Sequence, residues 1–356
     1  MARPLHLLLV GLLLAGAPGC YLLHATVGQL RIVSGRVPIA DVLEEARRPP
    51  EELDKLRLVL AAREFGVARC GLRESDSYTS LYETQGPWVV WQVSACEPDA
   101  FAAFVWSFPL VGALPYKGWF APEPAQAEAR ELAAQGLDAL VLPVPAFSTL
   151  GWFDDPVFSG MLREDPDWLV ATILHELTHA TVFVEADADW NENLAEFVGN
   201  EGARRFFLAR GGPEDPGLRA LERRLRDEAR IHVALLGLQQ ELWRVYEASG
   251  SREEKLAWKS ALLARFRVRM LTEVAPRLTD PGAATAWADP RLPLNNAYLL
   301  AVARYHGDQE LFRGLLARCG DDLPRLLELL AELEDEDEPR AAALARLAPE
   351  RPAAAR

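Results

Sequence analysis

The chain has 356 residues, of which 50% are hydrophobic and 25% are charged, as in globular chains of enzyme size. It carries 38 basic and 52 acidic residues, a net charge of −14, which argues against a general nucleic-acid binder because such proteins normally present a basic face. Its four cysteines are too few for a disulfide scaffold and include no CxxC pair. We therefore expect an acidic globular protein, either an enzyme or a binding protein, with no nucleic-acid partner.

Residues 1–20 have the features of a secretory signal. A positive charge at Arg3 precedes an apolar stretch from Leu5 to Ala15, and small residues lead to Cys20. The apolar run is shorter than the roughly 20 residues of a spanning helix. A cysteine at this place resembles a bacterial lipoprotein signal, in which the cysteine is lipidated and becomes the new N-terminus. We expect an exported protein of the cell envelope or periplasm, anchored to the membrane only through a lipid on Cys20; an ordinary cleaved signal is the alternative.

Residues 21–160 are expected to form a lobe of helices and strands. Residues 21–65 are predicted to be helical, because Leu53, Leu56, Val59 and Leu60 keep helical spacing among charged residues. Two runs rich in strand formers, residues 88–93 and 101–108, lie a hairpin's distance apart. A predicted helix at residues 122–135 is followed by an apolar strand at residues 137–144. These elements predict a small mixed sheet with at least one helix on it.

Residues 161–334 are expected to form a mostly helical lobe. Gly211-Gly212-Pro213 and Asp280-Pro281-Gly282 mark the clearest breaks between helices. The long amphipathic stretches cover residues 215–248, 252–278 and 295–334. The expected fold class is therefore α+β, with the seam between the two lobes near residues 160–200.

Residues 335–356 are expected to be a disordered tail. An acidic run around Glu338 borders an Ala/Arg/Pro-rich end, a composition typical of solvated chain ends. In an oxidising compartment two of Cys70, Cys96 and Cys319 could form a disulfide, but spacing does not select a pair.

The sequence His175-Glu176-Leu177-Thr178-His179 is an HExxH motif. Asp165 and Pro166 predict the start of a helix, on which the two histidines share one face and can bind one metal ion. Glu176 is offset from that face and can accept a proton from a metal-bound water. A bound zinc ion lowers the pKa of such a water toward neutrality.

A carboxylate pair follows the motif. Twelve residues separate His179 from Glu192, and Glu196 lies one helical turn later on the same face. Glu192 would complete a catalytic set of three protein ligands, and Glu196 could accept the spare ring N–H of a zinc-bound histidine. The alternative is a capping box with Asp189 as N-cap and Glu192 as its partner. In that case Glu196 or Asp187 would be the third ligand.

HExxH followed by an Asn-Glu helix resembles the gluzincin clan of zinc peptidases, typified by thermolysin and the zinc aminopeptidases. The resemblance implies that Glu192 is the third zinc ligand and that Glu196 braces a histidine. The gap after the second histidine is shorter here than in those enzymes. The resemblance implies a gluzincin-like arrangement, with the zinc site on two helices at the seam between the lobes.

The chain is also similar, over almost its whole exported length, to a family of predicted bacterial aminopeptidases that are often lipoproteins and share the short gap. The similar segments are Gly28-Gln29-Leu30, Arg36-Val37-Pro38-Ile39, Ser77-Tyr78, Val90-Trp91-Gln92-Val93, Phe108-Pro109-Leu110-Val111-Gly112, Tyr116-Lys117-Gly118-Trp119-Phe120, residues 148–156, the HExxH helix and Leu294-Asn295-Asn296-Ala297. This resemblance implies an aminopeptidase acting on peptide substrates.

In gluzincins an edge strand before the HExxH helix pairs with the substrate backbone. Residues 144–153 occupy that place in chain order, and Ser148, Thr149 and Gly151 would offer space and polar groups beside a substrate. A loop that packs its aromatic residues into the core is the compatible alternative.

Gluzincins also need a donor to the oxyanion of the tetrahedral intermediate. Tyr298, Tyr305 and His306 are the candidates, together with His232; the alternative for each is a place in the core.

The sequence therefore predicts a zinc metallopeptidase, in which one Zn²⁺ per chain is held by His175, His179 and Glu192 and Glu176 is the catalytic base. A zinc endopeptidase or processing protease of the cell envelope is one alternative. A non-catalytic envelope protein with a structural zinc ion is the other.

Overall fold

The computed structural model describes residues 17–108, 112–147, 149, 153–184, 187–287, 289, 291–333, 336 and 338–347. The fold is α+β and mostly helical, with small sheets. Its α-helices are α2 (Ala17–Gly35), α3 (Ile39–Glu45), α4 (Pro50–Cys70), α5 (Pro122–Ala134), α6 (Pro166–His179), α7 (Ala188–Gly211), α8 (Pro216–Glu247), α9 (Arg252–Arg269), α10 (Pro281–Ala286), α11 (Asn296–His306), α12 (Gln309–Arg318), α13 (Leu323–Ala331) and α14 (Pro339–Leu347). Short 3₁₀ turns and one π-turn are η1 (Ser159–Arg163), η2 (Gly212–Glu214), η3 (Met270–Val274, π) and η4 (Ala275–Arg277).

The strands of the described residues form three small sheets. They are β1 (Val37–Pro38), β2 (Ser80–Tyr82), β3 (Val90–Cys96), β4 (Trp106–Phe108), β5 (Gly112–Leu114), β6 (Lys117–Trp119), β7 (Asp138–Val144) and β8 (Val157–Phe158). The main sheet has the order β6-β3-β7 and is antiparallel throughout. A second sheet, β1-β2-β8, joins an antiparallel to a parallel pair, and β4 and β5 form a hairpin.

The small sheet with a helix on it, expected from these strand-forming runs, is present as β6-β3-β7 with α5, but the sheet is antiparallel where a mixed one was expected. The run at residues 101–108 pairs with β5, and only an isolated bridge between Cys96 and Ala103 connects it to β3. Gly112, with a φ of 74°, begins β5 in the left-handed region that favours glycine, so the chain can turn back on β4 there. Hydrophobic pattern alone does not select between these two partners.

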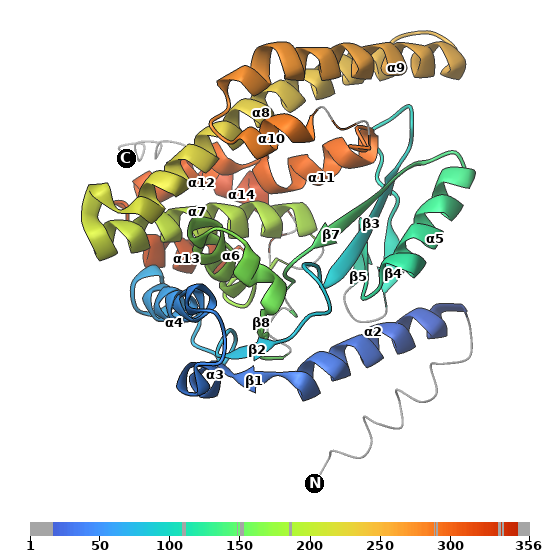
Figure 1. The fold of residues 1–356 in the computed structure, drawn as a ribbon. Helices are drawn as coiled ribbons and strands as arrows, with labels where there is room; N and C mark the ends of the chain where they lie inside the picture. Colours follow the sequence, from blue (N-terminus) through green and yellow to red (C-terminus); the bar gives the residue numbers. More distant parts are fainter. Residues whose placement is uncertain are drawn as a thin grey trace, which may run out of the picture.

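The two faces of the main sheet have different partners. On one face, Val93 and Ala95 pack against Ala125 and Leu132 of α5, which lies on the outer side of the sheet in Figure 1. Because side chains alternate along a strand, the residues between them point to the opposite face, where Leu140 packs against α11. The second face is therefore turned toward the helices that follow residue 160.

The main hydrophobic core contains residues from both sides of residue 160. Buried positions of α4, such as Leu56 and Val59, belong to the same cluster as Ile173 of α6 and Leu326 of α13. In Figure 1, α4 lies beside α6 and α13, while α2 runs along the bottom of the view and the α8–α9 pair along the top. The expected lobes thus share one core.

Part of the tail expected to be disordered is helical. Helix α14 lies within residues 335–356, and its Ala343 is fully buried in the main core. The small residues that gave the tail its low-complexity composition allow a short helix to pack closely against α12. Cys70, Cys96 and Cys319 are buried free thiols, so the disulfide considered among them does not form in this structure.

The described helices include no segment with the length and hydropathy of a membrane span. The predicted signal sequence, residues 1–20, lies largely outside the described residues, as does the side chain of Cys20, and export and lipidation stay predictions.

Candidate active site

Helix α6 carries the HExxH motif and is buried on most of its surface. It begins at Pro166, as predicted; Asp165 occupies the N-cap position but makes no side-chain capping hydrogen bond. His175 and His179 lie one turn apart and their Nε2 atoms are 3.2 Å from each other. Such closeness follows from the i, i+4 spacing, which places both rings on one face of the helix.

Helix α7 is capped by Asp187, whose side chain accepts a hydrogen bond from the backbone N–H of Trp190 at 2.9 Å. The capping box with Asp189 as N-cap is therefore wrong, and Glu192 is not used to cap the helix. The short gap before α7 is held by Asn191, whose amide group exchanges hydrogen bonds of 2.9 and 2.8 Å with the backbone of Val184. This pairing ties the first turn of α7 to Val184, which follows the HExxH helix closely in the sequence.

Helices α6 and α7 cross at Gly199. A Cβ atom at this position would lie 2.6 Å from the backbone oxygen of Ala171 and 3.0 Å from the Cβ of His175. The absence of a side chain therefore allows the two helices to approach closely at the turn that carries His175. The same approach brings the Glu192 carboxylate to the imidazole rings.

The side chains of His175, His179 and Glu192 meet at one point. Glu192 Oε2 lies 3.4 Å from His175 Nε2 and 3.6 Å from His179 Nε2. Three ligands of a tetrahedral zinc ion, each about 2.0–2.1 Å from the metal, are about 3.3 Å from one another. Together with the 3.2 Å between the two Nε2 atoms, these separations fit a zinc-sized cation.

The charges of the cluster also favour a cation. Burial lowers the pKa of His175, but hydrogen bonds with Glu192 and Glu196 outweigh burial and raise this pKa to about 10. Burial raises the pKa of Glu192, but the charge of His179 and the hydrogen bond with His175 hold it well below its ordinary value. The carboxylates thus create a negative potential between the rings, which attracts a proton or a metal ion.

Glu196 lies behind the first histidine. Its Oε2 is 3.5 Å from His175 Nδ1, and its other oxygen accepts a hydrogen bond of 2.6 Å from Asn200. Arg224 of α8 donates to the Asn200 side chain and to Asp167 at the start of α6. This chain of contacts fixes the orientation of the His175 ring from three helices.

Glu176 lines the same pocket as the three candidate ligands. Burial raises the pKa of its carboxyl group above the usual value, although the charges of His175 and His179 lower it. A carboxylate with a raised pKa is a better proton acceptor near neutral pH than an exposed one.

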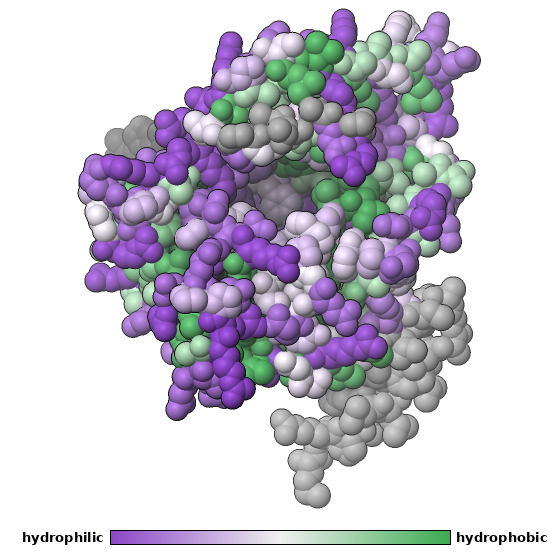
Figure 2. Space-filling model, viewed as in Figure 1, coloured by the Kyte–Doolittle hydropathy of each residue, from purple (hydrophilic) through white to green (hydrophobic). Residues whose placement is uncertain are grey.

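The pocket beside the cluster has a volume of about 430 Å³, within the usual range of small-molecule sites. In the space-filling view, the face is hollowed at its centre, between α11 above and α6 below (Figure 2). A closed structural metal site has no such space, so this arrangement fits a site that admits a ligand.

The candidate oxyanion donors have different places. Tyr305 lines the pocket, and its ring centre is 6.3 Å from that of His175. Tyr298 does not line it in the described structure and packs on Trp287 in another cluster. His306 lies with Glu196 in a smaller adjoining cavity, and His232 contacts His306 on its far side.

Tyr116, to which sequence reasoning gave no role, is a second phenol in the pocket. Burial and the charge of Glu192 raise its pKa, and the guanidinium of Arg304 lies 5.0 Å from its ring centre. Its only signal in the sequence was a place in a segment shared with the similar family.

Of the three residues predicted to lie beside the substrate, the structure describes only Thr149. Ser148 and Gly151 lie outside the described residues. The Thr149 hydroxyl bonds to the backbone of Phe153, and the Thr149 backbone N–H donates to the Asp155 side chain, so these polar groups have partners within the same segment. Among the described residues, the pocket is instead lined by the preceding four, Val144 to Phe147, at the end of edge strand β7.

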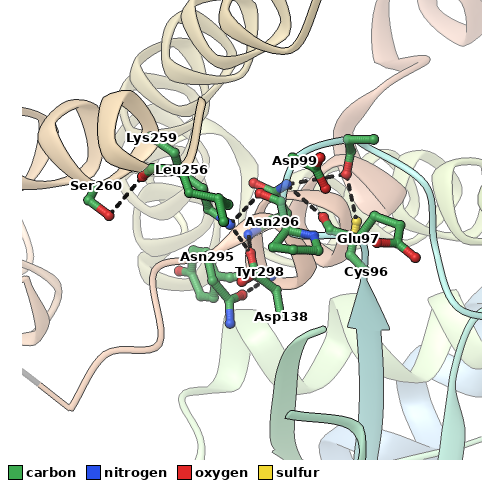
Figure 3. A network of polar contacts seen from close by, with 12 residues as sticks. Cys96, Glu97, Asp99, Asp138, Leu256, Lys259, Ser260, Asn295, Asn296 and Tyr298 are labelled. Atoms are coloured by element: carbon green, nitrogen blue, oxygen red, sulfur yellow. Dashed lines mark hydrogen bonds and ion pairs between the residues drawn. The ribbon is translucent and has the colours of Figure 1, made fainter. Parts of the chain in front are cut away.

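Asn295 and Asn296, at the start of α11, anchor this helix to the main sheet, as Figure 3 shows. Asn295 caps α11 by accepting from the Tyr298 N–H, and its amide donates to Ala139 of β7. The N–H of Asn296 donates to Asp138, which also binds the buried ammonium group of Lys259 from α9. This network holds the helix that carries Tyr305 in place.

No curated protein and no solved structure matches this chain. A family model described as "Putative aminopeptidase" matches residues 20–344, which include α6, α7 and α11 and all the described pocket residues. The family description is that of an enzyme acting on peptides, in agreement with a pocket beside a His-His-Glu cluster. With a match over most of its length, the chain belongs to the putative aminopeptidase family.

Proposed function

We propose that this protein is a zinc-dependent peptidase of the gluzincin type, and that it acts as an aminopeptidase. The observation that carries the proposal is the convergence of His175 Nε2, His179 Nε2 and Glu192 Oε2 within 3.2–3.6 Å at the wall of an open pocket. Membership of the aminopeptidase family supports a peptide substrate.

His175, His179 and Glu192 would hold the zinc ion, which when bound polarises a carbonyl group and acidifies a water molecule. Glu196 accepts the Nδ1–H of His175, which leaves the Nε2 lone pair of that ring free for the metal. Glu176 accepts the proton of the attacking water and returns it to the leaving amine, for which its raised pKa suits it.

The charge that develops on the substrate oxygen needs a donor. The pKa of Tyr305 is raised well above its usual value by burial and by the charge of Glu192, so its phenol stays protonated at neutral pH. A protonated phenol at the pocket wall can donate a hydrogen bond to a developing oxyanion. Tyr305 is therefore the donor in the proposed mechanism.

Metal analysis of the purified chain tests the zinc site. We expect about one zinc ion per chain in the wild type and in Glu176→Gln, because Glu176 is not a ligand. His175→Ala and Glu192→Ala should lose the ion, since each removes one of three protein ligands. Retained zinc in Glu192→Ala would contradict the ligand set, and Glu201→Ala, on the same helix but outside the cluster, is the matched control.

Peptide hydrolysis tests the reaction. The wild type should release the first residue of short peptides with a free N-terminus and leave N-acetylated peptides intact. Glu176→Gln should keep zinc but lose at least about 10²-fold in rate, because no group then accepts the proton of the water. Cleavage of acetylated peptides would instead indicate an endopeptidase, and full biological function of Glu176→Gln would indicate a structural zinc site.

A further inference from the structure

The pocket has two chemically different sides. Among the described residues that line it, every charged side chain belongs to the candidate metal site: His175, Glu176, His179, Glu192 and Glu196. Away from the cluster, its described lining is uncharged and mostly apolar or aromatic; six of these residues form what we call the apolar wall, and they are Tyr21, Ala25, Val90, Phe120, Val144 and Phe147. Charged groups are thus confined to the end where the reaction would occur.

The floor of this region is the face of the main sheet opposite α5. Val90 of β3 pairs with Val144 of β7, and Gln92 pairs with Gly118 of β6, so the four residues point to the same face. Gly118 contributes no side chain, and a Cβ there would be 3.1 Å from Val90. The floor is therefore apolar and has no side chain projecting into the pocket at Gly118; its single amide group is that of Gln92.

Helix α2, at the start of the described chain, closes one side. The Tyr21 hydroxyl donates to the Gly118 backbone oxygen at 3.1 Å, and His24 Nε2 accepts from the Phe120 N–H at 3.1 Å. Gly28 lies directly against the Phe120 ring, where a Cβ atom would lie 2.1 Å from a ring carbon. These contacts hold Tyr21 and Ala25, one helical turn apart, at the pocket.

We propose that the apolar wall receives an apolar side chain of the peptide substrate adjoining the scissile bond, and that α2 sets the size of that side chain through Tyr21 and Ala25. This rests on the proposed peptidase function. The described wall offers a charged side chain no ionic partner, so its burial there carries an uncompensated desolvation cost. An apolar side chain gains free energy when it leaves water for the same surface.

Binding of peptides to the Glu176→Gln variant tests the preference without turnover. The probes are two sets of tripeptides, with Leu, Phe, Asp or Lys at the first or at the second position and alanine elsewhere, titrated calorimetrically. In one of the two sets, the tripeptides with Leu or Phe at the variable position should bind at least about tenfold more tightly than those with Asp or Lys. Equal affinity within both sets, or no saturable binding of any peptide, overturns the proposal.

A matched pair of substitutions on α2 tests the role of the helix. Ala25→Trp fills the pocket and should weaken binding of the preferred Leu and Phe peptides at least about tenfold. Trialanine, the reference peptide, should lose less affinity. Val27→Trp, on the exposed side of the same helix, should leave all affinities unchanged, and both variants should keep wild-type circular dichroism. Equal effects of the two substitutions overturn the assignment of α2.

The two proposals can fail separately. A wild-type protein that hydrolyses no peptide, while its Glu176→Gln variant still prefers Leu and Phe, would overturn the peptidase function alone. Hydrolysis without any preference among the four side chains would overturn the apolar wall alone.

Discussion

Three phenols line the pocket; Tyr21 belongs to the apolar wall, and the other two are Tyr305 from α11 and Tyr116 from the segment before β6. Burial raises the pKa of both, and the charges of Glu192 and Glu176 raise it further, so both stay protonated near neutral pH. Tyr116 packs beneath Arg304, which forms an ion pair with Asp189, whereas the Tyr305 ring stands beside that of His175. This difference favours Tyr305, and not Tyr116, as the donor to the oxyanion.

We predict that Tyr305→Phe lowers kcat by about 10²-fold or more, because the change removes one donor to the developing oxyanion. KM and zinc content should change little, since the ring and the ligands remain. Tyr116→Phe is the matched control and should lower kcat less than tenfold. Steady-state kinetics with metal analysis of each variant provides the measurement, and a larger kcat effect at Tyr116 would transfer the donor role to that residue.

At the scale of single residues, the sequence predicted which side chains share one face of a helix, because helical spacing determines it. The pairs at positions 175 and 179 and at 192 and 196 are each i, i+4, so the common face of each pair follows from helix geometry alone. Tyr21 and Tyr116 could not be predicted in the same way. Their place in the same pocket as His175 depends on how α2 docks on β6 and how the sheet meets α6, and no local spacing encodes those contacts.

At the scale of elements, the position of α11 depends on the polar network around Asp138. The buried ammonium group of Lys259 binds Asp138 and donates to the Pro98 backbone oxygen at 2.8 Å. Asn296, fully buried, donates from its amide to the backbone oxygens of Glu97 and Ala100. These contacts tie α9 and α11 to strand β7 and to the loop that follows β3 (Figure 3). Movement of α11 would carry Tyr305 with it.

We predict that Lys259→Met destabilises the fold by about 2–3 kcal/mol, because it leaves the partly buried Asp138 carboxylate without its ionic partner. Activity should fall through kcat, measured at a temperature where the variant is folded, while zinc content stays near one. Ser260→Ala on the same helix is the control, since its exposed hydroxyl bonds only within α9. A urea midpoint for Lys259→Met equal to that of Ser260→Ala would contradict the anchoring role.

Element boundaries were predictable where a proline or glycine marks them. Helix α5 begins at Pro122 and α6 at Pro166, close to the predicted starts, because proline suits the first turn of a helix. The pairing of strands was less predictable, because the partner of a short apolar strand depends on the turn that joins them. The strand at residues 106–108 therefore formed a hairpin with β5 instead of the expected pairing with β3.

At the scale of the whole molecule, α14 connects the chain end to the active-site helices. Its Arg340 forms an ion pair with Asp308 at the start of α12, and the N–H of Asp308 donates to the Asn193 side chain at 3.1 Å. Asn193, next to Glu192 on α7, also donates to the backbone oxygen of Arg304 at 2.7 Å. One buried amide thus joins α7, α11 and α12. Composition alone could not predict this role for α14, because its helix is stabilised by packing with distant residues.

We predict that Ala343→Asp lowers the free energy of unfolding by about 2–4 kcal/mol, because it places an unpaired charge in the main core. This loss of stability cannot exceed the free energy that α14 gains by docking on the core, because the helix can undock and expose the charge to water. A chain that ends at Leu333 should therefore lose at least as much stability as Ala343→Asp. Ala345→Asp, on the exposed side of the same helix, should change stability by less than about 0.5 kcal/mol. Urea denaturation of all three proteins provides the comparison, and a truncated chain as stable as the wild type would show that α14 adds nothing to the core.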